Sequence, residues 1–219
     1  LVTAAANGLV ITVDDDTPTA SLALLTGTVD EEGVPNGLAG GIGDVAGAVT
    51  VAGGSVTSLF NSGADAPLTY ALSLTTIATL SALNLTSGGA ALSYVLVGDT
   101  VTASANGAAV FTFQVSAAGA YTFTLIDQLD HATGADENDL LISLGGIITA
   151  TDADGDLVTA AANGLVITVD DDTPTASLAL LTGTVDEDGV PNGLGGRRDV
   201  LADALTLAAR RSSGLFNSG

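Results

Sequence analysis

The chain has 219 residues, with 25 acidic and only four basic side chains, and its formal net charge at pH 7 is −21. A hydrophobic content of 47% separates it from acidic disordered segments, and its negative field excludes nucleic acid and anionic membrane surfaces as partners. It contains no Cys, which excludes disulfides, thiolate metal sites and a Cys nucleophile.

The basic side chains are confined to the end of the chain. Residues 1–193 contain no Lys or Arg but 23 of the Asp and Glu residues. These acids therefore have no Lys or Arg to neutralise them, so they are either solvated or bound to metal. No run reaches 18 apolar residues without polar breaks, so membrane insertion is not expected.

An internal repeat with an offset of 156 residues organises the chain. Leu1–Glu31 is identical to Leu157–Glu187, and Leu59–Gly63 returns as Leu215–Gly219. A period of this size describes a domain, so we expect domains in tandem within a longer protein. The predicted units are the last strand of a preceding repeat with its linker (residues 1–16), one complete repeat (residues 17–172) and the incomplete start of the next (residues 173–219).

Within the complete repeat, apolar and polar residues alternate with a period of two. Ala71–Leu85 fits either a strand or a short helix, and Asn106-Gly107, between Thr100–Ala105 and Ala108–Val115, predicts a two-residue hairpin. Short strands separated by frequent turns predict an all-β fold of tandem immunoglobulin-like β-sandwiches. The clearest predicted strand faces are Phe111, Phe113 and Val115; Tyr121, Phe123 and Leu125; and Leu165, Ile167 and Val169.

Residues 195–214 depart from the repetition, although both of their flanks match the first copy at equal length. Arg pairs replace Gly pairs there, and Asp199–Ala209 has the pattern of a helix. Two compensating reading-frame shifts would produce this departure. Sequencing of the DNA tests that hypothesis.

The segment Asp14-Asp15-Asp16-Thr17-Pro18 returns intact at residues 170–174. Two unit charges 4 Å apart repel by about 1 kcal/mol in bulk water and about 4 kcal/mol near a protein surface. A bound cation would remove this repulsion, and Ca²⁺ takes six to eight oxygen ligands from carboxylates, Asn and carbonyl groups. The predicted Ca²⁺ ligands are Asp14, Asp15, Asp16, Asp30, Glu31, Asp136, Glu137, Asp139, Asp152, Asp154, Asp156, Asp170, Asp171 and Asp172.

Chain direction sorts these acids into two groups. If the first and last strands of the repeat run the same way, the loop with Asp152, Asp154 and Asp156 lies beside Asp14–Asp16. The loops at residues 30–32 and 136–139 then lie beside Asp170–Asp172. The loop at residues 152–156 is not an EF-hand, because its Gly comes one residue early and its flanks are strand-like.

The sequence does not predict an enzyme. His131 is the only His, and a surface or loop-packing role is expected for it. No Gly-x-Ser-x-Gly motif is present to support a Ser-His-Asp triad. Paired acids would suit glycoside hydrolysis, but the low aromatic content of 4% leaves no sugar-stacking platform.

Several segments resemble the long tandem repeats of giant RTX and biofilm adhesins that Gram-negative bacteria export by type I secretion. The resemblance lies in residues 29–37 (VDEEGVPNG), 59–70 (LFNSGADAPLTY), 119–125 (GAYTFTL), 129–131 (LDH) and 150–156 (ATDADGD). It implies immunoglobulin-like extender domains with Ca²⁺ at the domain junctions. It also implies an extracellular, cell-surface location and contacts with neighbouring repeats of the same chain.

The expected function is therefore a calcium-stiffened extender of a secreted adhesin, active in cell adhesion and biofilm formation. Two alternatives stay open at this point. One is a calcium-dependent module that binds a glycan or ice. The other is an extracellular filament subunit that self-associates by strand exchange, because the strand Leu1–Val13 has no partner within its own repeat.

Overall fold

The computed structural model describes residues 10–41, 43–44, 47–134, 137–172 and 182–183. The strands are β1 (Thr19–Ala20), β2 (Leu25–Asp30), β3 (Val51–Ser55), β4 (Phe60–Asn61), β5 (Thr69–Leu72), β6 (Thr86–Ser87), β7 (Ala90–Ala91), β8 (Ser93–Val97), β9 (Thr100–Ala105), β10 (Ala108–Val115), β11 (Ala120–Leu125), β12 (Leu140–Ser143), β13 (Ile148–Thr151), β14 (Leu157–Thr159) and β15 (Leu165–Asp170). The helices are α1 (Thr76–Ser81) and the 3-10 turns η1 (Glu31–Gly33), η2 (Thr57–Leu59) and η3 (Gly145–Ile147).

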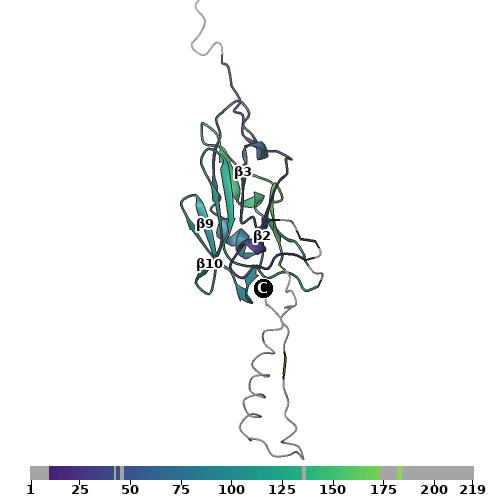
Figure 1. Cartoon of the computed structure of the whole chain (residues 1–219). Helices are drawn as coiled ribbons and strands as arrows, with labels where there is room; N and C mark the ends of the chain where they lie inside the picture. Colours follow the sequence, from purple (N-terminus) through teal and green to yellow (C-terminus); the bar gives the residue numbers. More distant parts are fainter. Residues whose placement is uncertain (1–9, 42, 45–46, 135–136, 173–181, 184–219) are drawn as a thin grey trace, which may run out of the picture.

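These strands form an all-β sandwich, as the alternating pattern predicts. One layer is an antiparallel sheet in the order β3-β11-β10-β9-β8. The facing layer consists of two three-stranded sheets, β12-β15-β2 and β14-β13-β5 (Figure 1). Short pairs, β1 with β4 and β6 with β7, complete the described strands.

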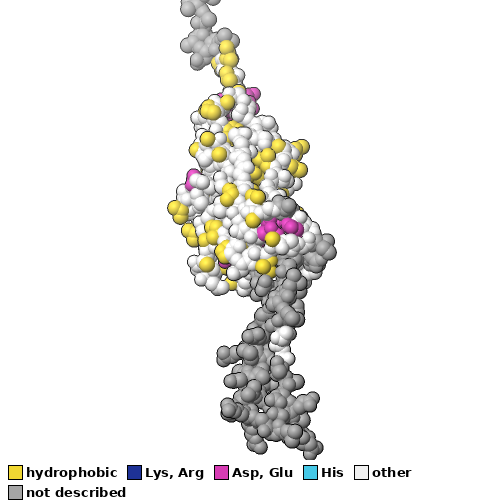
Figure 2. Space-filling model, in the orientation of Figure 1, with side chains coloured by type: hydrophobic (Ala, Val, Ile, Leu, Met, Phe, Trp, Pro, Cys, Tyr) yellow, Lys and Arg dark blue, Asp and Glu magenta, His cyan; other side chains and the backbone are white. Residues whose placement is uncertain are grey.

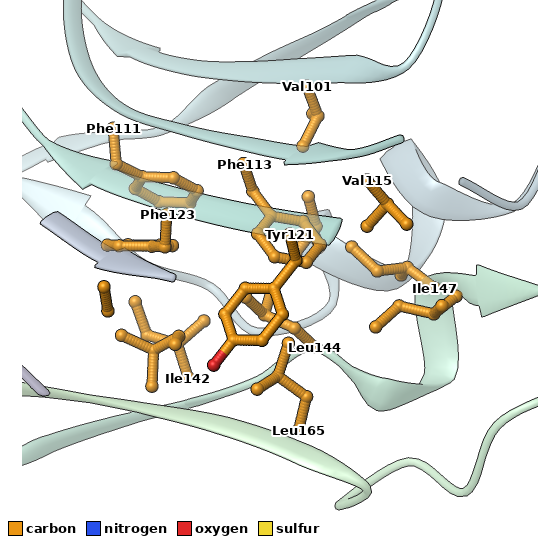
Figure 3. Close-up of a cluster of buried hydrophobic side chains, with 14 of the residues drawn as sticks. Val101, Phe111, Phe113, Val115, Tyr121, Phe123, Ile142, Leu144, Ile147 and Leu165 are labelled. Atoms are coloured by element: carbon orange, nitrogen blue, oxygen red, sulfur yellow. The ribbon is translucent and has the colours of Figure 1, made fainter. Parts of the chain in front are cut away.

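The core lies between the two layers. Figure 3 shows the rings of Phe111, Phe113 and Phe123 from the five-stranded sheet pointing toward aliphatic side chains from the opposite layer. All three Phe side chains are fully buried, and the centroids of Phe111 and Phe123 lie 5.0 Å apart in a stacked pair. These rings are among the largest fully buried side chains of the described residues, and they lie where the two layers meet. The labelled aliphatic partners are Ile142, Leu144, Ile147 and Leu165.

The predicted turn between β9 and β10 is present at Asn106-Gly107. Both residues have positive φ, 50° and 87° respectively, which a two-residue hairpin of the primed type requires. The ambiguous run Ala71–Leu85 is divided between the end of β5 and the short helix α1, so both predicted states occur in it. Local pattern therefore located the elements here without deciding where one ends and the next begins.

Two parallel strands define the ends of the body. β2 pairs with β15 in parallel, from Leu25 opposite Leu165 to Asp30 opposite Asp170. Figure 1 shows the chain reaching the body at one end through residues 10–16 and leaving it at the opposite end. We call the end near residues 10–16 the N-terminal pole and the end where β2 and β15 finish the C-terminal pole.

Several sequence predictions lie outside the described residues. They include residues 1–9, Asp136 and the segment 195–214 with its expected helix. Of the incomplete repeat that begins at residue 173, only residues 182–183 are described.

Candidate metal centres at the two poles

The loop between β13 and β14 forms a carboxylate cradle at the N-terminal pole. Asp152 Oδ1 accepts hydrogen bonds from the backbone N–H groups of Gly155 (3.0 Å) and Asp156 (2.8 Å). Gly155 has a φ of +113°, a conformation that favours glycine, and this closes the loop. Asp152 is only 7% exposed, and its second oxygen, Oδ2, is buried with no hydrogen-bond partner.

Two other segments bring acids to this loop. Asp15 lies with Asp154 and Asp156, and Asp65 lies with Asp152 and Asp154, with one oxygen of each residue within 4.8 Å of the others in its group. Asp16 Oδ2 accepts a hydrogen bond of 2.7 Å from the backbone N–H of Ala64, which ties the linker to the segment that carries Asp65.

The proximity of these carboxylates disfavours their ionisation. The neighbouring Asp152 carboxyl, together with some loss of hydration and the charges of Asp15 and Asp65, raises the pKa of the exposed Asp154 to about 6. Burial and the charge of Asp15 also raise the pKa of Asp156. For Asp152, burial acts in the same direction, but the hydrogen bonds it accepts outweigh it and lower its pKa. The cradle thus holds more negative charge than the protein itself compensates.

Asp30 and Asp170 face each other at the C-terminal pole. They occupy the last paired positions of β2 and β15, and they are only 2% and 3% exposed. Asp44 joins them, with one oxygen of each residue within 4.8 Å of the others. Asp30 Oδ1 caps η1 by accepting from Glu32 N (2.8 Å), whereas Asp30 Oδ2 and Asp44 Oδ1 are buried without a hydrogen-bond partner.

Burial is the main reason for the perturbed ionisation of Asp30. Together with the charges of Glu32, Asp170 and Asp44, it raises the pKa of Asp30 to about 6, against the hydrogen bond from Glu32 N. A buried carboxylate oxygen without a partner is costly unless a cation or a proton occupies the site. The donors are all oxygens, so both this cluster and the cradle fit the ligand preference of Ca²⁺.

A second group at the C-terminal pole contains the only histidine. Glu31 Oε1 accepts a 2.7 Å hydrogen bond from Leu129 N and lies 3.3 Å from His131 Nε2. His131 Nδ1 lies 2.6 Å from the carbonyl oxygen of Asn138. The side chains of His131 and Glu31 are 4% and 2% exposed, and Asp171 completes a group whose ligand atoms lie within 4.8 Å of one another.

The ionisation of this group is coupled through burial and charge. Burial raises the pKa of the Glu31 carboxyl more than its bonds to His131 and Leu129 lower it. Burial lowers the pKa of His131. The hydrogen bond and charge of Glu31 and the charge of Asp171 together raise this pKa by more than burial lowers it, so the net shift is upward. Burial also raises the pKa of Asp171.

The remaining predicted ligands have different surroundings. Asp172 Oδ2 accepts a 2.9 Å hydrogen bond from Leu38 N and so ties the end of the repeat to the loop after η1. The Glu137 side chain lies against Gly41, where a Cβ would collide with it. Asp14 and Asp139 are exposed and belong to none of the four groups of potential ligands found among the described residues.

Sequence reasoning missed three members of these groups. Asp44 follows a glycine-rich stretch, and Asp65 is a single acid in a loop, so neither belongs to an acidic cluster in the sequence. His131 was expected to pack in a loop; it does so, but its ring also contacts a buried carboxylate. Its position as the only His beside a carboxylate-rich segment was the available signal.

Figure 2 shows acidic side chains near both ends of the body, and the described residues include no Lys or Arg. Among the described residues, no helix is long and apolar enough to cross a bilayer.

Comparison with known proteins gives one family. A family model described as "Domain of unknown function (DUF5801)" matches residues 11–163. No curated protein and no solved structure matches the chain.

Proposed function

We propose that this chain, which belongs to the DUF5801 family of domains, is a calcium-stiffened extender repeat of a secreted, cell-surface adhesin. The proposal is based on the acidic groups at its two poles. In this role each sandwich is a spacer that holds a distal adhesive domain away from the cell. The partners are the preceding and following repeats. The observation that carries the proposal is the convergence of carboxylates at both ends of the body, where neighbouring repeats would join.

Because the sequence repeats, each Asp triplet would lie in a linker between two domains. Because residues 1–31 are identical to residues 157–187, Asp15 occupies the position in its linker that Asp171 occupies in the next one. Asp15 lies with Asp154 and Asp156, whereas Asp171 lies with Glu31 and His131. In a tandem chain, one linker carboxylate would therefore contact acidic groups of the domain before it and of the domain after it.

The third Asp of the triplet supports the same arrangement. Asp172 accepts from Leu38 N at the C-terminal pole, and Asp16 accepts from Ala64 N at the N-terminal pole. A single Asp in a tandem chain has enough acceptor capacity for both bonds. The linker would then be fixed to both neighbours by hydrogen bonds, and Ca²⁺ would neutralise the charge that accumulates there.

Residues 10–13 support the boundary between repeats. Val10, Ile11 and Val13 are 74%, 75% and 87% exposed, whereas Ile167 and Val169, the counterparts of Ile11 and Val13, are fully buried in β15. These exposed residues correspond to the end of a β15 strand whose sheet would belong to the preceding repeat.

Calcium binding to the folded state would stabilise it by mass action. The chain should therefore bind Ca²⁺ in isothermal titration, and its melting temperature should fall when Ca²⁺ is removed by chelation. Mg²⁺ at the same concentration is the control, since it demands stricter geometry and retains its waters. An unchanged melting temperature on chelation would contradict the proposal.

Stiffening needs a chain with two complete copies of residues 17–172. Small-angle scattering should give a larger maximum dimension in Ca²⁺ than in chelator. Replacing Asp170, Asp171 and Asp172 by Asn between the copies should abolish this difference, while Asp99→Asn, in the exposed β8–β9 turn, should preserve it. Equal dimensions in Ca²⁺ and chelator would leave calcium without a role in stiffness.

A second candidate function is filament assembly by strand exchange. The exposed apolar side chains of residues 10–13 favour it, because the same sequence forms a central strand at β15. Light scattering separates the candidates: assembly predicts a mass that rises with protein concentration, and an extender that does not self-associate predicts a constant monomer mass.

A further inference from the structure

We propose that Glu31, His131 and Asp171 form a binding site for one transition-metal dication of the zinc class. This site differs in chemistry from the oxygen-only groups assigned to Ca²⁺, because it includes an imidazole nitrogen. Imidazole suits Zn²⁺, Co²⁺ and Ni²⁺, whereas Ca²⁺ takes oxygen ligands. The inference goes beyond the extender role: Glu31 and Asp171 are also predicted Ca²⁺ ligands, but Zn²⁺ binding at His131 can be measured whether or not the chain is an extender.

The orientation of His131 is the first argument. A backbone carbonyl only accepts hydrogen bonds, so the 2.6 Å contact with the oxygen of Asn138 places a proton on Nδ1. Metal-binding histidines almost always donate their second ring N–H in this way, which fixes the tautomer and aims the other nitrogen at the metal. Here the other nitrogen, Nε2, faces Glu31 Oε1.

The separation of the two ligand atoms is the second argument. Nε2 and Oε1 lie 3.3 Å apart, which is longer than the ~2.7–2.9 Å of a charge-assisted N–H···O hydrogen bond. Two ligand atoms, each about 2.0–2.1 Å from a tetrahedral Zn²⁺, lie about 3.3–3.4 Å from each other. The pair is therefore already spaced as two ligands of one ion would be.

Burial and the third ligand complete the site. Both the imidazole and the Glu31 carboxylate are more than nine-tenths buried, and Leu129 N holds the same Glu31 oxygen from the backbone. Asp171 is half-buried, so a third carboxylate ligand and a water in the fourth position can reach the ion. A dication at this position would bind the deprotonated Nε2 atom, and any proton on that nitrogen would be released to solvent.

The single histidine permits a direct test on the unaltered chain. The imidazole ¹⁵N signals of the untagged chain belong to His131 alone, so they can be followed in millimolar Ca²⁺ while Zn²⁺ is added. We expect the Nε2 signal to change up to one equivalent of Zn²⁺ and then stay constant, with Nδ1 still protonated. Signals that do not respond to Zn²⁺ would overturn the proposal and leave a buried ion pair only.

Variants then identify the ligands by Zn²⁺ titration in the same Ca²⁺ buffer. Changing only the groups that hydrogen-bond to a metal ligand weakens metal binding by about 10–100-fold, so loss of the imidazole in His131→Gln should weaken it by at least about 100-fold. Asp99→Asn removes one carboxylate outside all four groups and should leave Zn²⁺ affinity within about twofold, as surface charges act weakly in salt. Equal Zn²⁺ affinity in His131→Gln and the unaltered chain would also overturn the proposal.

The outcome is separable from that of the calcium proposal. Zn²⁺ binding is measured with Ca²⁺ in excess, and Ca²⁺ affinity is measured in His131→Gln without Zn²⁺. If His131→Gln does not fold, the ¹⁵N titration of the unaltered chain decides the question.

Discussion

At the scale of single residues, the pair Asp30 and Asp170 places two acidic side chains close together in the buried part of the C-terminal pole. Both carboxyls are almost fully buried, they are opposite one another in the strand register, and Asp44 adds a third acid. Burial of a charge without compensation is far more costly than its exposure. The C-terminal pole is therefore stable with either a proton or a cation at this position.

The variant Asp30→Asn should have opposite effects with and without Ca²⁺. Asn retains an oxygen that can cap η1 by accepting from Glu32 N, but it removes one buried charge. In chelator the melting temperature should rise by a few degrees because repulsion is relieved. In Ca²⁺ it should fall below that of the unaltered chain, because a ligand charge is lost.

Scanning calorimetry of both proteins in both buffers measures these shifts. The matched control is Asp99→Asn, which also removes one acidic charge but lies in none of the acidic groups. If Asp30→Asn lowers the melting temperature equally in chelator and in Ca²⁺, its effect is loss of the cap and not of charge.

The metal-free chain should lose stability as pH rises from about 4 to about 7. The pKa of Asp30 and that of Asp154 are each raised to about 6, above the usual ~3.9 of Asp. A group with a raised folded-state pKa binds its proton more tightly when folded. It stabilises the fold fully below its unfolded pKa and loses that contribution as pH rises through the folded value. The raised pKa of His131 acts in the same direction.

Melting temperatures of chelator-treated, desalted protein across this pH range test whether stability falls as pH rises. Saturating Ca²⁺ should flatten or reverse the trend, since the ion requires deprotonated ligands. A metal-free melting temperature that rises with pH would contradict the pKa shifts.

At the scale of elements, local pattern predicted the long strands well. β10, β11 and β15 follow from strict alternation, and the β9–β10 turn follows from Asn106-Gly107, because such signals depend on neighbours in sequence. Strand direction accounts for part of the grouping of acids, because β2 and β15 run parallel. It places Asp154 and Asp156 beside Asp15, and Asp30 beside Asp170, whereas Asp14 and Asp139 join no group. The short strands β1, β4, β6 and β7 have no comparable signal, because two residues cannot show a period.

The positions of Asp44, Asp65 and His131 were beyond such reasoning. Each lies in a segment between strands, and its burial depends on how that segment folds back over a pole. Asp44 reaches Asp170 from the opposite half of the repeat, and His131 reaches Glu31 from 100 residues away. Long-range packing of loops, and not propensity, decides these contacts.

Two turn glycines provide a matched test of backbone strain and packing. Gly107 and Gly119 have φ values of +87° and +86°, but a Cβ on Gly107 would meet nothing within 4 Å. A Cβ on Gly119 would lie 2.9 Å from Thr57 Cγ2 and 3.0 Å from the Tyr70 ring. Gly107→Ala should therefore lower the free energy of unfolding by about 1–2 kcal/mol from backbone strain alone. Gly119→Ala should lower it by about 2–5 kcal/mol, because overpacking is added.

Urea denaturation of both variants measures the difference. The unaltered chain in the same Ca²⁺ buffer is the reference, since metal binding contributes to the total. Equal losses in the two variants would mean that Thr57 and Tyr70 move aside without penalty.

At the scale of the whole molecule, the family match and the fold have different boundaries. The match ends at residue 163, before β15, which is the middle strand of the sheet β12-β15-β2. Leu165, Ile167 and Val169 of β15 are each fully buried. A folding unit that omits this strand would expose the core and separate β12 from β2.

Two truncated chains test whether the folding unit requires β15. Residues 17–172 should unfold in a single cooperative transition in Ca²⁺, whereas residues 17–163 should show none. Residues 1–13 must be absent from both chains, because their sequence duplicates residues 157–169 and could replace β15. A cooperative transition in residues 17–163 would show that β15 is dispensable.

The parallel pairing of β2 and β15 has a mechanical consequence. The chain enters β2 from the N-terminal pole and leaves β15 at the C-terminal pole, so a pull on the two termini draws these neighbouring strands in opposite directions. All the hydrogen bonds between Leu25–Asp30 and Leu165–Asp170 then resist in shear at once, instead of opening one after another as in a zipper. A tether under flow, made of such units, would stay folded until this whole ladder broke.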